Sequence, residues 1–553
     1  MQNRPWLRHY DFQVPETFKY PQIPASEFLI HASKLFPDKT ALNCYGTRTT
    51  FWELRRKVFA MARVMGEMGV EKGDRVALHL PNSPQYVIAF YATLALGATV
   101  VNLNPMYTAE ELSGICANTG VSTLFTFDKV MPNIRALTGR VTINRVVVTR
   151  VTDFVDGFPV STVKELELDE GWCHFSELLE NAPAAGPPKA VINPRDPALI
   201  QFTGGTTGIP KGAVLTHQNL VAGTIQCANW AAAFLGKIPV ERQTSLCVLP
   251  FFHVYGTIVA LSASIYNCTT QVLVPRFELD ELMGLISGFD EINFFPAVPT
   301  MINAVINHPK AEELNLDRRL GLLNSGGGPL ATELIDRVLD MGIPYSEGWG
   351  MSETTSLGIS NPIMGLKKTG SIGVPFPDAD VRLVDLAEGK EDVPRGEPGE
   401  ILFKSPLVMA GYWDNPEETR NQLTEDGWLY TGDIAVMDED DYLFIVDRKK
   451  DMIIAGGYNV YPREIDEVLY QHPKVADAVS IGVADQYRGE TVKAFIVLKA
   501  GETATDKEIM EFARTKLAPY KAPKTVEFRD DLPKSAVGKI LRKELRKEEE
   551  GKQ

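Results

Sequence analysis

The stretch FTGGTTGIPKG, at residues 202–212, directly follows an apolar segment, residues 198–202, that has the length and composition of a buried β-strand. Its glycines let the backbone approach phosphate oxygens closely, its threonine hydroxyls and backbone amides are hydrogen-bond donors, and Lys211 adds a positive charge. This combination predicts a loop that holds a polyphosphate at the end of a strand. A Walker A loop is excluded, because that motif places Ser or Thr after its lysine and this chain has Gly212 there.

The sequence before this loop alternates between helical and extended patterns. Apolar residues recur at helical spacing from Leu54 to Met68 and lead through a turn into the apolar segment 76–80. Thr108 and Glu111 have the spacing of a capping box, which predicts the start of a helix. The alternation of helices and strands predicts α/β layers with largely parallel sheets.

Two breaks divide the chain. The proline-rich residues 181–197 predict a linker between subdomains, and the charged run DRKKD, residues 447–451, marks a second boundary. Beyond that boundary Pro462 has the position of a first-turn proline in a helix. Two strand candidates and a further helix follow, at residues 475–483, 492–498 and 506–517. This C-terminal region is expected to fold as a separate lid.

The composition limits the functional classes. The 553 residues hold 56 Lys and Arg against 71 Asp and Glu, a net charge of −15, so nonspecific attraction to nucleic acid is not expected. The six cysteines are scattered without a CxxC pair, which favours neither a disulfide framework nor a zinc site. The apolar stretch 86–101 is shorter than the roughly 20 residues that a transmembrane helix needs. The N-terminus lacks the apolar core of a signal peptide. We therefore expect a cytoplasmic enzyme without an integral membrane segment.

Further motifs follow the glycine and threonine loop: GWGMSET (348–354), YTGD (430–433), DRKKDMIIAGGYNVYPREIDEVL (447–469) and PKSAVGK (533–539). In this order the motifs resemble the adenylate-forming superfamily, which includes acyl-CoA synthetases, peptide-synthetase adenylation domains and beetle luciferases. Residues 426–450 are similar to the signature of fatty acyl-CoA synthetases. The resemblance implies an α/β N-terminal domain of layered subdomains plus a β-rich subdomain, residues 1–449, and a small mobile α+β C-terminal domain, residues 450–553.

The resemblance also implies the nucleotide-binding residues. Asp433 and Arg448 would bind the ribose, and Trp349 would stack on the adenine where relatives more often have tyrosine. Glu353 would help to hold Mg²⁺, which prefers hard oxygen ligands. The other ATP- and AMP-binding candidates are Thr203, Gly204, Gly205, Thr206, Thr207, Gly208, Gly327, Gly328, Gly350 and Thr354.

The catalytic candidates carried over from the family are Lys539, Lys211 and His253. Lys539 would reach the acyl carboxylate and the α-phosphate during adenylation. Lys450 matches the family hinge, about which a C-terminal lid would rotate between two half-reactions. Gly456 and Gly457 would line a tunnel for the pantetheine arm of coenzyme A. The acyl-pocket candidates are His253, Val254, Gly256, Phe295, Val298 and Gly326.

The predicted function is an ATP-dependent acyl-CoA ligase that forms acyl-AMP and pyrophosphate, then acyl-CoA and AMP. ATP, Mg²⁺ and coenzyme A are the expected cofactors and substrates, and a medium- or long-chain fatty acid is the favoured acid. The alternatives are an aryl or other carboxylic acid, an enzyme that loads a carrier protein, a luciferase-like oxygenase, and a nucleotide-binding protein without catalysis. Peripheral membrane contact and a homodimer are left open by the sequence.

Overall fold

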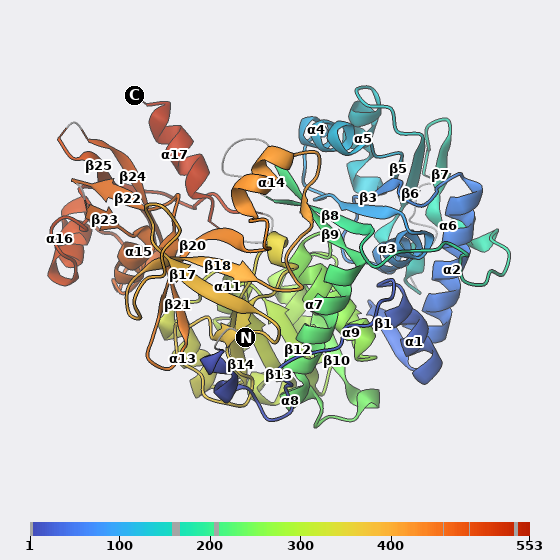
Figure 1. The fold of residues 1–553 in the computed structure, drawn as a ribbon, viewed down its shortest axis with the longest axis horizontal. Coiled ribbons are helices and arrows are strands. Elements are labelled where there is room, and N and C mark those ends of the chain that lie inside the picture. Colours follow the sequence, from blue (N-terminus) through green and yellow to red (C-terminus); the bar gives the residue numbers. More distant parts are fainter. Residues whose placement is uncertain are drawn as a thin grey trace.

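The computed structural model describes residues 4–156, 166–203, 210–456, 458–485, 487–535 and 540–552. Figure 1 shows helices α1 (Glu27–Leu35) and α2 (Phe51–Glu67) at one end of the molecule, the C-terminal elements at the other, and the N-terminus near the middle. Two large sheets with helices packed around them make up most of the chain before the C-terminal elements. The described helices do not combine the length and the apolar character that a bilayer crossing requires.

The first sheet carries the strand before the glycine and threonine loop. Strands β4, β3, β5, β6 and β7 run parallel, and β8 pairs with β4 in the same direction. Strand β9 returns antiparallel to β8, with Thr203 opposite Lys211. The sheet order is β19 (Gly411–Tyr412), β9 (Lys211–Thr216), β8 (Pro197–Thr203), β4 (Thr99–Asn102), β3 (Arg75–Leu78), β5 (Thr123–Phe127), β6 (Arg145–Thr149) and β7 (Trp172–His174).

The second sheet has a parallel centre in which β12, β13 and β14 are neighbours. Its inner strands are almost wholly buried, as expected for a sheet covered on both faces. The sheet order is β16 (Val374–Pro375), β15 (Ile359–Ser360), β14 (Tyr345–Trp349), β13 (Leu320–Ser325), β12 (Ile292–Ala297), β10 (Thr244–Cys247), β11 (Thr270–Leu273), β1 (Thr40–Cys44) and β2 (Thr47–Thr50).

Helices cover these sheets, and their ends follow the local sequence. Thr108 and Glu111 form the predicted capping box, with the Thr108 amide donating to Glu111 Oε2 at 2.8 Å. The apolar stretch 86–101 forms most of the buried helix α3 and then enters β4. The longer helices are α1 (Glu27–Leu35), α2 (Phe51–Glu67), α3 (Pro84–Leu96), α4 (Ala109–Thr119), α5 (Met131–Thr138), α7 (His217–Trp230), α10 (Leu279–Ser287), α11 (Pro299–Ile306) and α13 (Thr332–Asp340). The shorter ones are α6 (Phe175–Glu180), α8 (Ala232–Leu235), α9 (Ala263–Tyr266) and α12 (Leu316–Arg319), and a π-helix, η6, spans Gly256–Ser262.

A β-rich unit follows, as the sequence predicted. An antiparallel sheet orders β17 (Asp380–Val384), β18 (Gly399–Lys404), β20 (Leu429–Met437) and β21 (Leu443–Arg448), and helix α14 (Pro416–Gln422) lies between β18 and β20 in the chain. In this sheet Asp433 of β20 is the register partner of Arg448 of β21. The sheet thereby places one residue of the YTGD motif next to one residue of the DRKKD motif.

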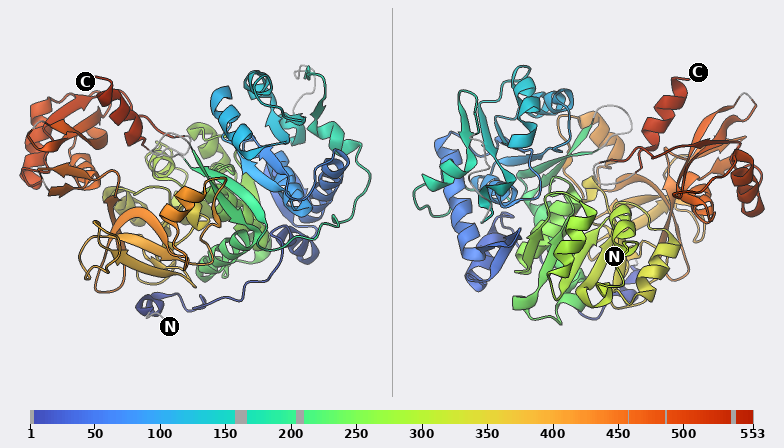
Figure 2. Two further views of the ribbon diagram at one scale, coloured as in Figure 1. Left: turned by 45° about the horizontal axis from the view of Figure 1, so that its top comes forward. Right: turned by 180° about the vertical axis from the view of Figure 1, so that it is seen from behind.

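The C-terminal residues form a separate lobe in both views of Figure 2. Its sheet contains β23 (Tyr458–Val460), β22 (Ile453–Ala455), β25 (Gly489–Leu498), β24 (Val475–Asp485) and β26 (Thr525–Phe528), and its helices are α15 (Pro462–Tyr470), α16 (Asp506–Lys516) and α17 (Arg542–Glu550). The predicted first-turn proline is confirmed, because Pro462 begins α15. Among the described residues, the buried apolar clusters of this lobe are built from Ile453 and residues after it, so the lobe has cores of its own.

Candidate nucleotide and acyl site

The predicted site residues lie where the parallel strands end. Trp349 is the last residue of β14, Gly326 follows β13, Val298 follows β12, and Thr203 is the last residue of β8. Because β12, β13 and β14 are parallel neighbours, their carboxyl ends meet at one edge of the sheet. Open α/β sheets bind their ligands at this edge, so the strand topology itself brings the predicted residues together.

The phosphate-loop residues that the structure describes include Thr203 and Lys211, which pair at the end of the hairpin where β8 connects to β9. Lys211 forms an ion pair with Glu418 of α14, and its ammonium group lies 5.4 Å from the centre of the Tyr412 ring. Gly204, Gly205, Thr206, Thr207 and Gly208 lie outside the described residues. The sequence analysis did not predict Glu418 or Tyr412; their position across from Lys211 depends on β19 pairing with β9.

Glu353, the predicted metal-associated carboxylate, is 6% exposed. The Tyr412 hydroxyl donates to its Oε1 at 2.8 Å, and burial raises the pKa of the Glu353 carboxyl above its ordinary value. In the described parts of the chain no cluster of three or more His, Cys, Asp or Glu side chains could hold a metal. A single carboxylate fits Mg²⁺ bound mainly through waters and substrate phosphates, and such an ion would supply positive charge there.

Three predicted nucleotide contacts form one connected cluster. The Trp349 indole N–H donates to Asp433 Oδ2 at 2.7 Å, and Arg448 Nε lies 3.3 Å from Asp433 Oδ1. The indole ring also meets Phe403 edge to face, with the ring centres 5.8 Å apart. An indole, a carboxylate and a guanidinium therefore share one surface beside the strand ends.

The neighbouring residues of the GWGMSET motif support the turn itself. A Cβ at Gly350 would lie 1.9 Å from the Ser356 carbonyl oxygen, so only glycine fits there. Thr354 is buried, and its hydroxyl oxygen accepts a hydrogen bond from the Met351 amide at 3.0 Å. This contact gives the Thr354 side chain a role in shaping the turn.

The glycines after β13 face the residues after β12 and the ring of Tyr255. A Cβ at Gly326 would lie 3.0 Å from the Tyr255 ring, and the Tyr255 hydroxyl donates to Asn324 Oδ1 at 2.7 Å. Gly327 has a φ of +82°, which favours glycine, and Gly328 lies beside Pro299. Tyr255 was not among the predicted site residues, although it lies between the predicted residues Val254 and Gly256.

The remaining acyl-pocket candidates follow β10 or lie in β12. His253 Nδ1 accepts a hydrogen bond from the Tyr255 amide at 3.2 Å, so a neutral His253 carries its proton on the other ring nitrogen. Val254 and Phe295 are buried. Gly256 begins the π-helix, and a Cβ there would lie 2.1 Å from the Pro250 carbonyl oxygen.

A network of buried polar side chains holds the segment before His253. Asn82 donates to the Leu249 carbonyl oxygen at 2.9 Å, and Gln201 donates to the Phe252 carbonyl oxygen at 3.1 Å. The Tyr86 hydroxyl lies 2.7 Å from the Phe251 carbonyl oxygen. These side chains come from the first sheet and its helix, and Gln201 is two residues before Thr203. The network therefore connects the phosphate-loop strand to the acyl-pocket segment.

The predicted hinge and tunnel residues lie at the start of the C-terminal lobe. Lys450 is exposed in the turn after β21, and its carbonyl oxygen accepts a hydrogen bond from Arg546 of α17 at 3.3 Å. Gly456 has a φ of +62° at the turn of the β22–β23 hairpin. Gly457 and Lys539 lie outside the described residues.

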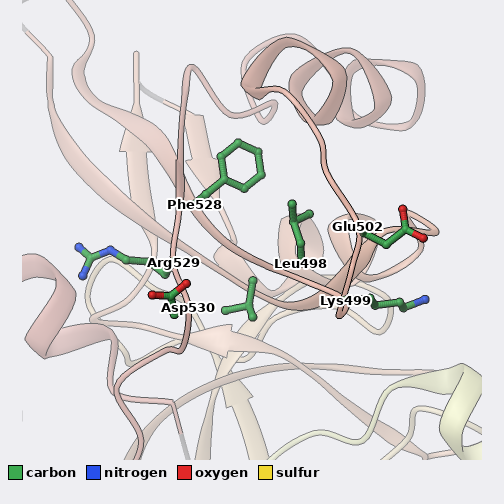
Figure 3. Close-up of a pocket in the computed structure, with 7 residues that line it drawn as sticks. Leu498, Lys499, Glu502, Phe528, Arg529 and Asp530 are labelled. Atoms are coloured by element: carbon green, nitrogen blue, oxygen red, sulfur yellow. The ribbon is translucent and has the colours of Figure 1, made fainter.

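A cavity of about 460 Å³ lies elsewhere in the C-terminal lobe, where Figure 3 shows Phe528, Arg529 and Asp530 across from Leu498, Lys499 and Glu502. The Arg529 guanidinium is already paired with Glu527 and Glu548. None of the predicted site residues lines this cavity.

The family described as AMP-binding enzyme matches residues 29–413, and its C-terminal domain matches residues 464–539. A long-chain-fatty-acid–CoA ligase of Bacillus subtilis is 39% identical over 99% of this chain and 98% of its own length. The anthranilate CoA ligase AuaEII, solved in complex with anthranoyl-AMP, has a TM-score of 0.83 at 27% identity, over 96% of this chain and 97% of its own. ATP-bound MatB from Rhodopseudomonas palustris has a TM-score of 0.82 at 27% identity, over 95% of this chain and 99% of its own.

These similarities cover both lobes and all of the motifs that the sequence analysis singled out. The predicted α/β fold with a small C-terminal domain is confirmed, as is the resemblance to adenylate-forming ligases. ATP with Mg²⁺ and coenzyme A are the expected substrates of such ligases, and an ATP-bound neighbour supports this prediction. The chain therefore belongs to the AMP-binding enzyme family and is an AMP-forming acid–CoA ligase.

Proposed function

We propose that the acid this ligase activates is a medium- or long-chain fatty acid. The observation that carries the proposal is the 39% identity to a long-chain-fatty-acid–CoA ligase over nearly the whole of both chains. The anthranilate ligase is more distant, at 27% identity. The residues after β10, β12 and β13 that would face the acid include Val254, Val298 and Gly326, which are apolar or lack a side chain.

The proposed reaction has two steps. The carboxylate oxygen of the acid attacks the α-phosphorus of ATP, and the bond to pyrophosphate breaks to give acyl-AMP. The thiol of coenzyme A, on losing its proton, then attacks the acyl carbon, and the bond to AMP breaks to give the thioester. Attack of one anion on another is slow unless positive charge and hydrogen-bond donors are placed where charge develops.

Each part of the site has a proposed role in these steps. Thr203 and Lys211 bind phosphates, and Asp433 and Arg448 bind the ribose. Trp349 stacks on the adenine, with Gly327 and Gly328 on the other side. Glu353 contributes an oxygen for Mg²⁺. The 2.7 Å and 3.3 Å contacts within the Trp349, Asp433 and Arg448 cluster support the nucleotide assignment, because they show that the cluster is already assembled.

We further propose that residues 1–449 and 450–553 act as two domains joined at Lys450. Separate apolar cores on either side of this position support the division. Contacts between the two sides include hydrogen bonds from Arg463 of α15 to the Ile445 carbonyl oxygen and from its amide to Asp447 Oδ2, both at 2.8 Å. A junction held by hydrogen bonds of this kind is compatible with rotation of the lid.

The cysteine chemistry supports a proposal about compartment. All six cysteines are free, and burial raises the pKa of the Cys44 and Cys227 thiols to about 12. Buried neutral thiols persist in a reducing compartment such as the cytoplasm, where we propose that the protein acts.

The substrate proposal is tested by measuring acyl-CoA formation with acids from acetate to palmitate and with benzoate and anthranilate. The expected result is the highest kcat/KM for an acid of about eight or more carbons, since each buried CH₂ contributes about 0.8 kcal/mol. A higher kcat/KM for an aryl acid would refute the fatty-acid assignment. Pyrophosphate exchange that does not depend on coenzyme A, followed by transfer only to a carrier protein, would refute free coenzyme A as the acceptor.

A further inference from the structure

Both oxygens of the Asp433 carboxylate already face a donor from the protein. Trp349 Nε1 donates to Oδ2 at 2.7 Å, and Arg448 Nε lies 3.3 Å from Oδ1. The Asp433 side chain is only 12% exposed, so both contacts are largely shielded from water. The hydrogen bond at Oδ2 and the ion pair at Oδ1 together restrict rotation of the carboxylate.

We propose that Trp349 is a positioning residue for ribose recognition: its indole N–H fixes the orientation of the Asp433 carboxylate that accepts hydrogen bonds from the ribose hydroxyls. This inference rests on the proposed nucleotide site and adds a second role for Trp349 beside adenine stacking. The face of the indole contacts the base, and its edge aligns the acceptor for the sugar.

The acceptor capacity of Asp433 allows this arrangement. An ionised carboxylate has about four lone-pair positions on its two oxygens. The indole uses one on Oδ2, and the Arg448 guanidinium forms an ion pair at Oδ1, so each oxygen keeps an acceptor position for a ribose hydroxyl. The indole N–H of Trp349 can only donate, and a largely buried N–H needs a hydrogen-bond acceptor. Asp433 is that acceptor.

The indole itself has little freedom to move. Phe403 meets the ring edge to face, and a Cβ at Gly358 would lie 2.6 Å from Trp349 Cζ3. Glycine at position 358 therefore lets the backbone approach the ring directly. Because Phe403 and the backbone at Gly358 hold the ring on two sides, packing within the protein sets the direction of its N–H.

A double-mutant cycle tests the inference. Equilibrium binding of Mg-ATP, without acid or coenzyme A, is measured by calorimetry for wild type, Trp349→Phe, Asp433→Ala and the double variant. Phenylalanine keeps an aromatic face but has no N–H. We expect Trp349→Phe to weaken ATP binding about 10-fold or more in the wild-type background. In the Asp433→Ala background the fold-loss caused by Trp349→Phe should be at least about 5 times smaller, because the energies of contacting residues are coupled.

A second series varies the ligand and needs no change at Asp433. The penalty of Trp349→Phe is compared for ATP, 2′-deoxyATP and 3′-deoxyATP. We expect the loss of affinity caused by Trp349→Phe to be several-fold smaller for at least one deoxynucleotide. That nucleotide lacks the ribose hydroxyl that would donate to the Asp433 carboxylate, so alignment of the carboxylate no longer helps its binding. Trp230→Phe is the matched control, since Trp230 also donates a buried N–H, to the Asn361 carbonyl oxygen at 3.1 Å, outside this cluster.

The outcomes separate this inference from the proposed site. If Trp349→Phe weakens all three nucleotides equally and acts additively with Asp433→Ala, Trp349 only stacks and the positioning role is refuted. If Asp433→Ala leaves ATP binding unchanged, the proposed ribose site is itself wrong.

Discussion

Lys211, the lysine of the phosphate loop, forms an ion pair with Glu418 at the start of α14, 207 residues later in the chain. The two side chains are 23% and 25% exposed, so the pair is partly screened by water. Glu418 thus pairs with the ammonium group that the proposed function assigns to phosphate binding. Phosphate binding has to compete with this carboxylate.

The first prediction follows from that competition. Glu418→Gln should lower the KM for ATP about 1.4- to 5-fold, because a partly exposed ion pair contributes about 0.2–1 kcal/mol. Lys211→Ala should raise the KM for ATP instead. Steady-state kinetics at saturating acid and coenzyme A check both. Glu417→Gln, next to Glu418 on an exposed part of α14, is the control, and a higher KM in Glu418→Gln would show that Glu418 positions Lys211 rather than competing for it.

The second prediction concerns pH and the buried Glu347 of β14. Glu347 is 5% exposed, and burial raises the pKa of its carboxyl from 4.5 to about 7, although Arg463 partly offsets the rise. A raised folded-state pKa means that the folded protein holds this proton more tightly. Glu347 therefore lowers the stability of the fold as pH increases from about 4.5 to about 7, and the loss persists above pH 7.

Glu347→Gln should remove this loss, because glutamine does not titrate. The variant should be more stable than wild type at pH 8 by up to about 3 kcal/mol, and the difference should shrink at pH 5. Thermal unfolding at both pH values measures this, with the exposed Glu333→Gln as control. A difference that is the same at pH 5 and pH 8 would rule out titration of Glu347 as the cause.

A third prediction tests the buried polar network. Gln201 donates to the Phe252 carbonyl oxygen and accepts from Asn102 Nδ2 at 3.2 Å. Gln201→Leu removes the donor to the Phe252 carbonyl oxygen and one of the acceptors of Asn102 Nδ2, and it should cost about 1–3 kcal/mol of stability. Since His253 follows Phe252 directly, the KM for the acid should rise as well. The exposed Gln22→Leu is the control, and an unchanged KM for the acid would confine the network to a stabilising role.

The fourth prediction concerns the close contact between Gly326 and Tyr255. A methyl group at Gly326 would lie 3.0 Å from the Tyr255 ring, which cannot easily retreat because its hydroxyl is bonded to Asn324. Gly326→Ala should therefore disturb the proposed acyl pocket at a cost of about 1–3 kcal/mol and raise the KM for long acids. Gly284→Ala, where a Cβ meets nothing within 4 Å, is the control. Normal kinetics with long acids would show that Tyr255 does not border the acyl chain.

Local patterns predicted much of this fold. The strand before the phosphate loop, the capping box at Thr108, the proline at the start of α15 and the alternation of helices and strands are all encoded by neighbouring residues. The independent C-terminal lobe could likewise be expected from its own apolar segments. Such features depend on spacing within about 20 residues, which a sequence displays directly.

The contacts across the site could not be predicted in this way. Lys211 meets Glu418, and Glu353 meets Tyr412, only because the short strand β19 pairs with β9. The requirement for glycine at position 326 depends on the Tyr255 ring, which belongs to the segment after β10, whereas Gly326 follows β13. Pairing of distant segments is decided by the packed tertiary structure, and no local periodicity in residues 411–418 reveals it.

The central claim is that one mobile C-terminal domain serves two half-reactions in turn. Its direct test measures both half-reactions in Lys539→Ala and Lys450→Pro: acid-dependent exchange of pyrophosphate into ATP, and thioester formation from supplied acyl-AMP and coenzyme A. The account predicts that Lys539→Ala loses exchange by about 100-fold or more but keeps thioester formation, whereas Lys450→Pro keeps exchange and loses thioester formation. Equal loss of both half-reactions in either variant would contradict it.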